Sequence, residues 1–389
     1  MHIFVPREGK PGELRVAIVP DVVSKYIRAG FSVAVESGAG IHAQADDGAF
    51  ASVGAEIVGA TGIANADVIL SVNPLTPEQF ASVKKGAITI SFLSPTQSID
   101  AIGAAAKASA TSFSLELVPR ISRAQSMDAL TSQALCAGYR AALVAAELSP
   151  RFFPLLMTAA GTVTPANVVV LGAGVAGLQA IATARRLGAV VSAYDVRPAS
   201  ADEVRSMGAT FIDLKLEALE GAGGYAREMT EERAAKQREL LTPFLASADV
   251  VITTAAVPGR PAPRLVTEEM VAAMKAGSVI VDLAAESGGN VAGALPGEIV
   301  EKNGVRIWGG KDVPSQLAFH ASQLFAKNCM NLLLLMVKSE SDTSGALKSS
   351  LHLDFDDEII AASAVTHEGE IRHEGAKAAL ANGTNGKGN

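Results

Sequence analysis

The chain has 389 residues, of which 49% are hydrophobic and 19% charged, and its net charge is −7. This composition is typical of a globular protein with two or three domains and excludes a disordered chain. The acidic balance argues against nucleic acid as a partner, because no basic excess is present to neutralise phosphates. The two cysteines, Cys136 and Cys329, lie far apart without metal-binding spacing, so we predict no metal site.

The N-terminal part alternates apolar strands with helices. Helices are predicted over Asp21–Ala29 and Ser98–Ser109, with Ser98 as a plausible N-cap. The predicted strands are Met1–Val5, Ser32–Glu36, Asp67–Val72, Ile88–Phe92 and Thr111–Leu115. Such alternation indicates a doubly wound, mostly parallel sheet.

A polar loop, Val118–Asp128, precedes a long predicted helix at Asp128–Leu148. A second long helix is predicted at Gln316–Lys338, and short strands with a hairpin at Leu351–His373. Between the helices we predict the six strands of a dinucleotide-binding domain: Asn167–Leu171, Val190–Tyr194, Thr210–Ile212, Asp249–Thr253, Ser278–Leu283 and Val305–Trp308.

The predicted fold is therefore α/β, with two doubly wound parallel-sheet (Rossmann-like) domains joined by two long helices and a cleft between them. The first domain comprises residues 1–128 and about 330–380. The second is the dinucleotide-binding domain, residues 129–329, and residues 381–389 are expected to be a disordered tail. The apolar stretch 166–184 is long enough to span a bilayer, but it contains three glycines, so we expect a soluble chain without direct membrane insertion.

A glycine-rich turn follows the strand Asn167–Leu171. The sequence Gly-Ala-Gly-Val-Ala-Gly from Gly172 to Gly177 stands between this strand and a predicted helix, as a pyrophosphate-binding turn requires. Gly172 permits the tight turn, Gly174 lets the backbone approach the pyrophosphate, and Gly177 lets helix and strand pack closely. The helix N-terminus then offers backbone N–H groups to the anion.

Asp195 ends the next strand, 18 residues after Gly177. A carboxylate here accepts hydrogen bonds from the adenosine ribose hydroxyls and repels a 2′-phosphate, so NAD is favoured over NADP. Arg197 slightly weakens the predicted preference for NAD, since a guanidinium two residues after Asp195 is able to bind the 2′-phosphate of NADP.

Two further segments have two interpretations each. In the loop Val118–Asp128, Arg120 or Arg123 and Gln125 suit polar contacts with a ligand, but a solvated loop before a helix explains them equally well. The segment Gly221–Tyr225 has the composition either of a lid over a ligand or of a plain linker.

The 118–128 loop, the glycine-rich turn from Gly172 and the segment around Tyr225 resemble the corresponding segments of one protein family. This family is the NAD(H)-binding component of proton-translocating nicotinamide nucleotide transhydrogenases. The PRISRAQSMD and GGYA strings are much more specific than the glycine pattern, and the matches span residues 6 to about 290. The matching strings are PREGKPGELRVAIVP, ELVPRISRAQSMDALTSQ, AGYRA, MTAAGTVTPANVVVLGAGVAGLQAIATA, GGYAREM, ITTAAVPGRPAPRLVTEEMV and GSVIVDLAAESGGN.

The resemblance implies a role for each matching residue. Arg120, Gln125 and Asp128 would position the nicotinamide, without acid–base chemistry, at the face that meets an NADP(H)-binding component. Tyr225 would be the tip of a mobile loop. The residues expected to bind NAD(H) are Arg120, Ile121, Ser122, Gln125, Asp128, Gly172, Gly174, Val175, Gly177, Asp195, Val196, Arg197, Gly224, Tyr225, Gln237 and Ala256.

Alanine dehydrogenase is the relative with different chemistry, and it shares an arginine matching Arg15. Its catalysis needs a lysine, a histidine and an aspartate where this chain has Ser71, Phe92 and Glu286. Ser71 and Phe92 cannot exchange a proton near neutral pH as a general acid or base must. Direct hydride transfer between two nicotinamides needs only position and orientation, so these differences favour the transhydrogenase interpretation.

The resemblance also implies partners. It predicts a separate NAD(H)-binding polypeptide that forms a homodimer and acts with membrane-spanning and NADP(H)-binding subunits. The location expected is cytoplasmic, peripheral at the inner face of the membrane through those subunits. The alternatives are an amino-acid dehydrogenase or an NAD(H)-sensing module without turnover.

Overall fold

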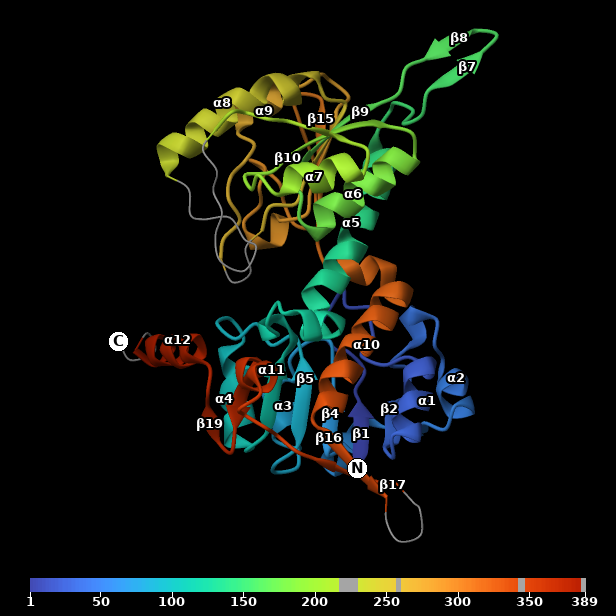
Figure 1. The fold of residues 1–389 in the computed structure, drawn as a ribbon, viewed down its shortest axis with the longest axis vertical. Helices are drawn as coiled ribbons and strands as arrows, with labels where there is room; N and C mark the ends of the chain where they lie inside the picture. The colour runs from blue at the N-terminus through green and yellow to red at the C-terminus, as the bar shows by residue number, and fades with distance from the viewer. Residues whose placement is uncertain (217–229, 257–259, 342–346, 386–389) are drawn as a thin grey trace. The chain divides into compact units, whose positions relative to one another are not determined.

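The computed structural model describes residues 1–216, 230–256, 260–341 and 347–385, and it divides into two units. The first unit takes in residues 1–133 and 315–389, and the second residues 134–314 (Figure 1). The long helix α5 (Ala129–Leu148) contains the first boundary. The chain returns to the first unit at Ser315, earlier than the predicted position near 330, because α10 (Ala318–Leu335) packs against other elements of that unit.

The first unit is built on an eight-stranded sheet. Its strands are β1 (His2–Val5), β2 (Ser32–Glu36), β3 (Glu56–Val58), β4 (Val68–Leu70), β5 (Ile88–Ser91), β6 (Thr111–Ser114), β18 (Ala364–His367) and β19 (Glu370–Ile371). Their order is β19-β18-β6-β5-β4-β1-β2-β3. The strands from β6 to β3 are parallel, whereas β18 and β19 continue the sheet in antiparallel orientation.

Helices cover both faces of this sheet (Figure 1). Ile3 and Val5 of β1 pack in one apolar cluster with α1 and α10, whereas Phe4 packs on the opposite face with α3 and α4. Both faces are buried because successive side chains of a strand point to opposite sides. The helices of this unit are α1 (Pro20–Arg28), α2 (Asp47–Ser52), α3 (Pro77–Phe80), α4 (Ile99–Lys107), α10, α11 (Glu358–Ser363) and α12 (Glu374–Asn385).

The second unit contains a seven-stranded sheet. Its strands are β9 (Asn167–Leu171), β10 (Val190–Tyr194), β11 (Thr210–Phe211), β12 (Val250–Thr253), β13 (Val279–Asp282), β14 (Ile299–Lys302) and β15 (Val305–Gly309). Their order is β11-β10-β9-β12-β13-β15-β14, and all are parallel except the edge strand β14. The strand order reverses between β9 and β12, the point at which open α/β sheets bind ligands.

The central strand β9 shows why this sheet is buried on both sides. Val168 and Val170 pack in the cluster that contains α6 (Val175–Arg186), while Val169 and Leu171 pack in the cluster that contains α8 (Glu231–Ser247). All four side chains are at most 2% exposed. The remaining helices of the unit are α7 (Ser200–Ser206) and α9 (Glu268–Ala272).

Every strand predicted from the sequence is present, and the fold class is the predicted one. The prediction omitted β3, β14 and two hairpins, β7 (Leu156–Thr158) with β8 (Gly161–Val163) and β16 (Val337–Ser341) with β17 (Leu347–Leu351). The expected disordered tail begins as helix, since α12 continues to Asn385. Ala376 of this helix is fully buried beside Leu93 and Ile102, so its first turn is anchored in the first unit.

Candidate functional site

The glycine-rich turn joins β9 to α6 as the sequence predicts. Gly172 has φ +101°, a conformation that favours glycine, and an added Cβ would lie 2.6 Å from Thr254 Oγ1. An added Cβ at Gly177 would lie 1.8 Å from the Gly172 carbonyl oxygen, so this glycine is required by packing. An added Cβ at Gly174 would meet no atom of the described residues within 4 Å. The turn therefore leaves open space at Gly174 alone among its three glycines.

This open space lies at the N-terminus of α6. Gly174 is the N-cap residue, Val175 begins the helix, and no described side chain caps the first turn. The backbone N–H groups of that turn and the positive end of the helix dipole suit an anion such as a pyrophosphate. The residues present therefore fit a dinucleotide, because the backbone is accessible where a phosphate would approach.

Asp195 follows β10 and is held from two sides. Its Oδ2 accepts a hydrogen bond of 2.7 Å from the N–H of Ala173, in the middle of the glycine-rich turn. Arg197 binds the same carboxylate through Nε and Nη2, each at 2.9 Å. The side chain of Asp195 is 8% exposed and that of Arg197 23%. Hydrogen bonding to the Asp195 carboxylate raises the pKa of Arg197 above its ordinary value. Asp195 thus links the turn to Arg197, a connection that the spacing did not predict.

The segment after β12 is fixed by a residue that the sequence analysis did not single out. Asn290, fully buried, accepts the Ala255 N–H at 3.0 Å and donates to the Ala255 and Pro263 carbonyls at 2.8 Å each. Thr254 Oγ1 donates to the Gly172 carbonyl at 3.0 Å. These bonds connect the segment to the glycine-rich turn and leave the next residue, Ala256, exposed.

Gln237 lies on α8 with only 2% of its surface exposed. Its Oε1 accepts a hydrogen bond of 3.0 Å from the hydroxyl of Tyr194, at the end of β10. Burial raises the pKa of Tyr194 to about 12, so the phenol remains protonated and donates. Val196, between Tyr194 and Arg197, is partly buried against the same apolar cluster. Gln237 therefore packs against the end of β10, directly before Asp195.

The 118–128 segment belongs to the first unit. Most of it is a 3-10 helix, η4 (Ser122–Met127), rather than the loop predicted from its polarity. Ala124 and Met127 are buried in the apolar core, whereas Arg120, Ser122 and Gln125 are exposed and Ile121 is partly buried. The segment thus has an apolar side and a polar side, and Arg120, Ser122 and Gln125 lie on the polar side.

Two side chains of the 118–128 segment already have strong partners. Arg123 makes a bidentate ion pair with Asp357 at 2.8 and 2.9 Å, so it holds the segment to α11. Asp128 accepts hydrogen bonds from the Thr131 N–H at 2.8 Å and from its hydroxyl at 2.6 Å, as a cap of α5 does. Of the two arginines weighed from the sequence, Arg123 thus pairs with the N-cap residue of α11.

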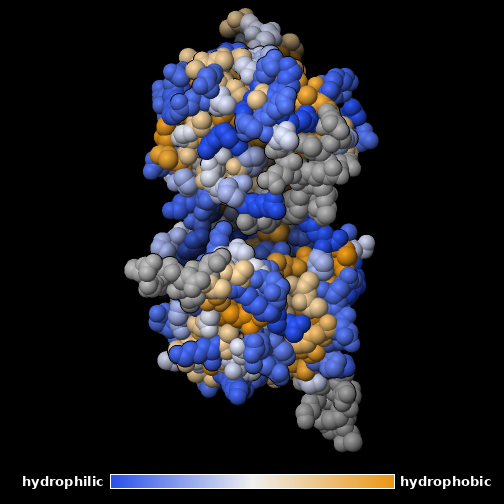
Figure 2. Space-filling model, turned by 90° about the vertical axis from the view of Figure 1, so that its left-hand side faces the viewer, coloured by the Kyte–Doolittle hydropathy of each residue, from blue (hydrophilic) through white to orange (hydrophobic). Residues whose placement is uncertain are grey.

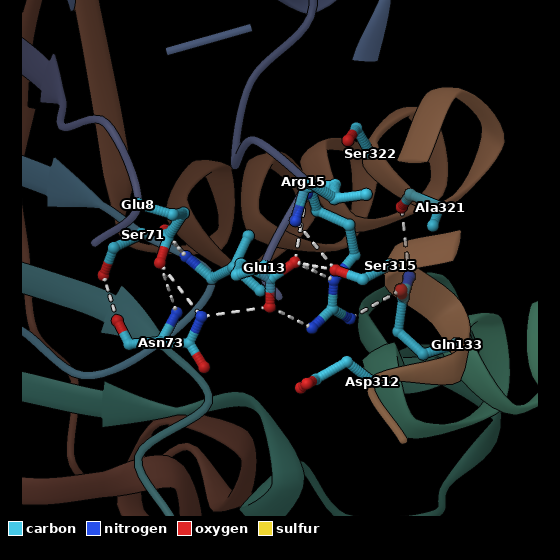
Figure 3. A network of polar contacts seen from close by, with 12 residues as sticks. Glu8, Glu13, Arg15, Ser71, Asn73, Gln133, Asp312, Ser315, Ala321 and Ser322 are labelled. Atoms are coloured by element: carbon cyan, nitrogen blue, oxygen red, sulfur yellow. Dashed lines mark hydrogen bonds and ion pairs between the residues drawn. The ribbon is translucent and has the colours of Figure 1, made fainter. Parts of the chain in front are cut away.

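A polar network surrounds Arg15 in the first unit (Figure 3). The guanidinium donates to both carboxylate oxygens of Glu13, at 2.7 and 2.6 Å, and to Gln133 Oε1 at 2.9 Å. Asn73 bridges Glu13 and Glu8, donating to each at 3.0 Å. Burial alone would raise the pKa of Glu13, but the hydrogen bonds and charge of Arg15 lower it to about 2. Burial raises the pKa of Glu8.

Ser71, Phe92 and Glu286, the positions compared above with alanine dehydrogenase, each contact a neighbouring residue of the fold. Ser71 is 2% exposed, and its hydroxyl donates to the Asn73 carbonyl at 2.7 Å. The Phe92 ring contacts that of Phe325 on α10, with centroids 5.2 Å apart. Glu286 is exposed and accepts the Asp312 N–H at 2.9 Å. Neither Ser71 nor Phe92 offers a group that takes up a proton near neutral pH.

The predicted site residues thus form two described groups. Unit 2 brings together Gly172, Gly174, Val175, Gly177, Asp195, Val196, Arg197, Gln237 and Ala256 at the carboxyl ends of β9, β10 and β12. Unit 1 holds Arg120, Ile121, Ser122, Gln125 and Asp128. Gly224 and Tyr225 lie outside the described residues.

The surface of each unit is of mixed polarity. Figure 2 shows hydrophilic residues spread over the visible face of each unit with hydrophobic ones between them. In the part of the chain that the structure describes, no helix combines the length and apolar character needed to cross a bilayer. Within those same described ranges, no group of three or more potential metal ligands occurs.

Two family models match the chain. The one described as "Alanine dehydrogenase/PNT, N-terminal domain" matches residues 4–137, and "Alanine dehydrogenase/PNT, C-terminal domain" matches residues 141–374. The boundary between the two matches falls within α5, near the boundary between the structural units.

Individual proteins are similar over nearly the whole chain. A polypeptide of the NAD(P) transhydrogenase alpha subunit of Rhodospirillum rubrum is 48% identical over 383 residues, 96% of this chain and 98% of that protein. A transhydrogenase structure from Sinorhizobium meliloti matches with a TM-score of 0.83 at 43% identity, over 96% of this chain and 99% of that one. An alanine dehydrogenase of Mycobacterium tuberculosis is 33% identical over 301 residues, 76% of each chain.

Proposed function

Because the chain belongs to the alanine dehydrogenase/PNT family, we propose that it is the NAD(H)-binding subunit of a proton-translocating NAD(P) transhydrogenase. The reaction is direct hydride transfer between NADH bound here and NADP⁺ bound to a partner subunit. Membrane-spanning subunits couple this transfer to proton translocation. On this proposal the subunit is cytoplasmic and lies at the inner face of the membrane through those partners.

The single observation on which the choice of cofactor rests is the arrangement at Gly174 and Asp195. Gly174 leaves space at a helix N-terminus, which supports binding of a pyrophosphate. The Asp195 carboxylate stands at the strand end where ribose hydroxyls donate hydrogen bonds, which supports NAD rather than NADP. By the family resemblance, Val175, Val196, Gly224, Gln237 and Ala256 would line the same nucleotide site, and Tyr225 would be the tip of a loop that closes over it.

The nicotinamide end is assigned to the 118–128 segment. The exposed side chains of Arg120, Ser122 and Gln125, with Ile121 and Asp128, would orient the ring for transfer. When bound, the nicotinamide supplies the hydride, and the chain supplies no acid or base. Ser71 and Phe92 support this assignment, because an amino-acid dehydrogenase needs proton-exchanging groups at those positions.

The proposal includes a homodimer. The β7–β8 hairpin of the second unit exposes apolar side chains, with Met157 79% and Leu156 38% accessible. Apolar side chains gathered on an exposed hairpin are typical of an interface. The mass of the purified chain in solution, measured by light scattering, tests this part.

The central experiment measures transfer with and without a partner. The purified chain should bind NADH but catalyse no turnover alone, and adding an NADP(H)-loaded partner component should start transfer between the nucleotides. Gln125→Asn should slow that transfer more than it weakens NADH binding. Alanine oxidation by the chain alone would support the amino-acid dehydrogenase instead. NADH binding without transfer to any competent partner would support a sensing module.

A further inference from the structure

One backbone carbonyl of the 118–128 segment is held by two side chains of α10. The Ser126 carbonyl oxygen accepts a hydrogen bond of 2.9 Å from Asn328 Nδ2 and another of 3.0 Å from Asn331 Nδ2. Ser126 directly follows Gln125 in η4. The carbonyl that these amides hold therefore belongs to the same short helical turn as Gln125.

Asn328 is the more firmly placed of the two asparagines. It is 6% exposed, and its Oδ1 accepts a hydrogen bond of 2.7 Å from the Ser132 hydroxyl on α5. Gln133 Nε2 in turn donates to Ser132 Oγ at 3.1 Å and to the Ala321 carbonyl of α10 at 3.1 Å. One buried amide thus connects η4, the first turns of α5 and the middle of α10.

The hydrogen bonds of Asn328 are not the only contacts that hold the 118–128 segment in the first unit. Ala124 and Met127 are buried in the apolar core, and Arg123 is paired with Asp357. These contacts keep the segment against the first unit. Hydrogen bonds to the Ser126 carbonyl fix the peptide plane between Ser126 and Met127. They thereby hold in place the helical turn of η4 from which the Gln125 side chain projects, one residue before the fixed plane.

We infer that Asn328 is a positioning residue for hydride transfer. It acts by holding the Ser126 carbonyl and, through the turn of η4, the orientation of the Gln125 side chain. The inference rests on the proposed function, in which the polar side of the 118–128 segment orients the nicotinamide. Asn328 itself touches no nucleotide on this view. Because reaction rates depend steeply on the alignment of reacting groups, a displacement of about 1 Å costs on the order of 100-fold in rate.

The test compares transfer rate with NADH affinity in Asn328→Ala. The full chain is assayed with an NADP(H)-binding partner component, and NADH binding is measured separately by fluorescence. Transfer should fall at least about tenfold, whereas the dissociation constant for NADH should stay within about twofold, since the residues proposed for the adenosine and pyrophosphate lie in the second unit. The matched control is Asn331→Ala, which leaves the bond from Asn328 to Ser126 intact and should slow transfer less than about threefold.

The outcomes separate this inference from the proposed function. Absence of transfer by the wild-type chain with its partner would contradict the proposed function. A wild-type rate for folded Asn328→Ala, or a loss of rate matched by an equal loss of NADH affinity, would overturn the positioning role. Should Asn328→Ala fail to fold, Ser132→Ala removes the hydroxyl that donates to Asn328 Oδ1 and that accepts from Gln133 Nε2, while the Asn328 amide itself remains. That variant should slow transfer severalfold with unchanged NADH affinity, and a wild-type rate would overturn the inference.

Discussion

Arg197 and Asp195 form a bidentate pair in which Nε and Nη2 of the guanidinium each lie 2.9 Å from a carboxylate oxygen. The pair changes the interpretation of Arg197. A free guanidinium at this place would be able to bind a 2′-phosphate, whereas here it is directed onto the acid that would repel one. Arg197 therefore reinforces the choice of NAD through its pairing with Asp195.

The first prediction concerns Asp195→Asn. Binding of NADH should weaken by about 1–3 kcal/mol, because a charged hydrogen-bond acceptor for the ribose is lost. Binding of NADPH should weaken less or improve, since Arg197 is released from its partner. Titration of both nucleotides by fluorescence or calorimetry measures the change. Asp202→Asn serves as the control, because that carboxylate is 92% exposed and pairs with the surface residue Arg205; it should bind both nucleotides as the wild type does.

The second prediction separates two glycines of one turn. Gly177→Ala should destabilise the fold by roughly 3 kcal/mol, the upper end for overpacking, because its Cβ would lie 1.8 Å from the Gly172 carbonyl oxygen. Gly174→Ala should cost less than about 1 kcal/mol of stability, since no atom of the part of the chain that the structure describes lies within 4 Å of the added Cβ. It should nevertheless weaken NADH binding at least about tenfold, because the methyl group occupies the space left for the pyrophosphate.

Thermal unfolding and NADH titration of both variants test this pair. Equal losses of stability in the two variants would show that the methyl group added at Gly174 clashes with other atoms. Wild-type NADH affinity in a stable Gly174→Ala variant would place the pyrophosphate elsewhere.

The third prediction concerns Asn290→Ala. Removing this amide leaves the Ala255 N–H and two carbonyls without their partner in a buried place, so the free energy of unfolding should fall by about 1–3 kcal/mol. NADH binding should weaken as well, because Ala255, which precedes Ala256, loses both hydrogen bonds to the Asn290 side chain. Chemical denaturation and NADH titration give the two values. Wild-type NADH affinity in a destabilised variant would show that the Asn290 bonds serve the fold alone.

The fourth prediction is a pH dependence set by Glu13. Its pKa in the fold is about 2, below the ordinary value of 4.5, so the Glu13–Arg15 pair stabilises the fold above pH 4.5 and loses this contribution as the pH falls toward 2. Glu13→Gln should cost on the order of 3 kcal/mol near neutral pH, because Arg15 loses a buried partner. The difference between wild type and variant should shrink below pH 4.5.

Denaturation of both proteins between about pH 7 and about pH 2.5 measures this difference. Glu8 acts in the opposite sense, since its raised pKa favours the protonated form. Because the charge of Glu13 contributes to that shift, both proteins are compared in a Glu8→Gln background. Glu56→Gln, at an exposed position, is the matched control and should follow the wild type at every pH. A constant gap between wild type and Glu13→Gln would contradict the assignment.

The sequence was most informative where local pattern and chemistry coincide. The turn from Gly172 to Gly177 needs a strand before it and a helix after it, and both follow from short runs of adjacent residues. The strand β9 is similarly evident, because four consecutive apolar residues are buried on both faces of the sheet.

Features that depend on distant contacts were not predictable in this way. Asn290 and Asn328 are ordinary polar residues in the sequence, and their roles arise from hydrogen bonds to segments 35 and 202 residues away. The helix η4 was predicted as a loop because only Ala124 and Met127 of its turn are apolar and buried, too few to show a helical period. The strands β7 and β8 were missed because their side chains are exposed and form no buried alternating pattern.

The contact between Phe92 and Phe325 has a consequence for how this family diversifies. Phe92 stands where the resemblance places a catalytic histidine in alanine dehydrogenase, and its ring packs against α10. Introducing histidine would replace part of an apolar contact by a ring that needs hydrogen-bond partners, so Phe325 would have to change with it. Ser71, buried and bonded to Asn73, sets a similar barrier to a lysine. Acquiring a histidine at 92 and a lysine at 71 would therefore require compensating changes around Phe325 and Asn73 in the same protein.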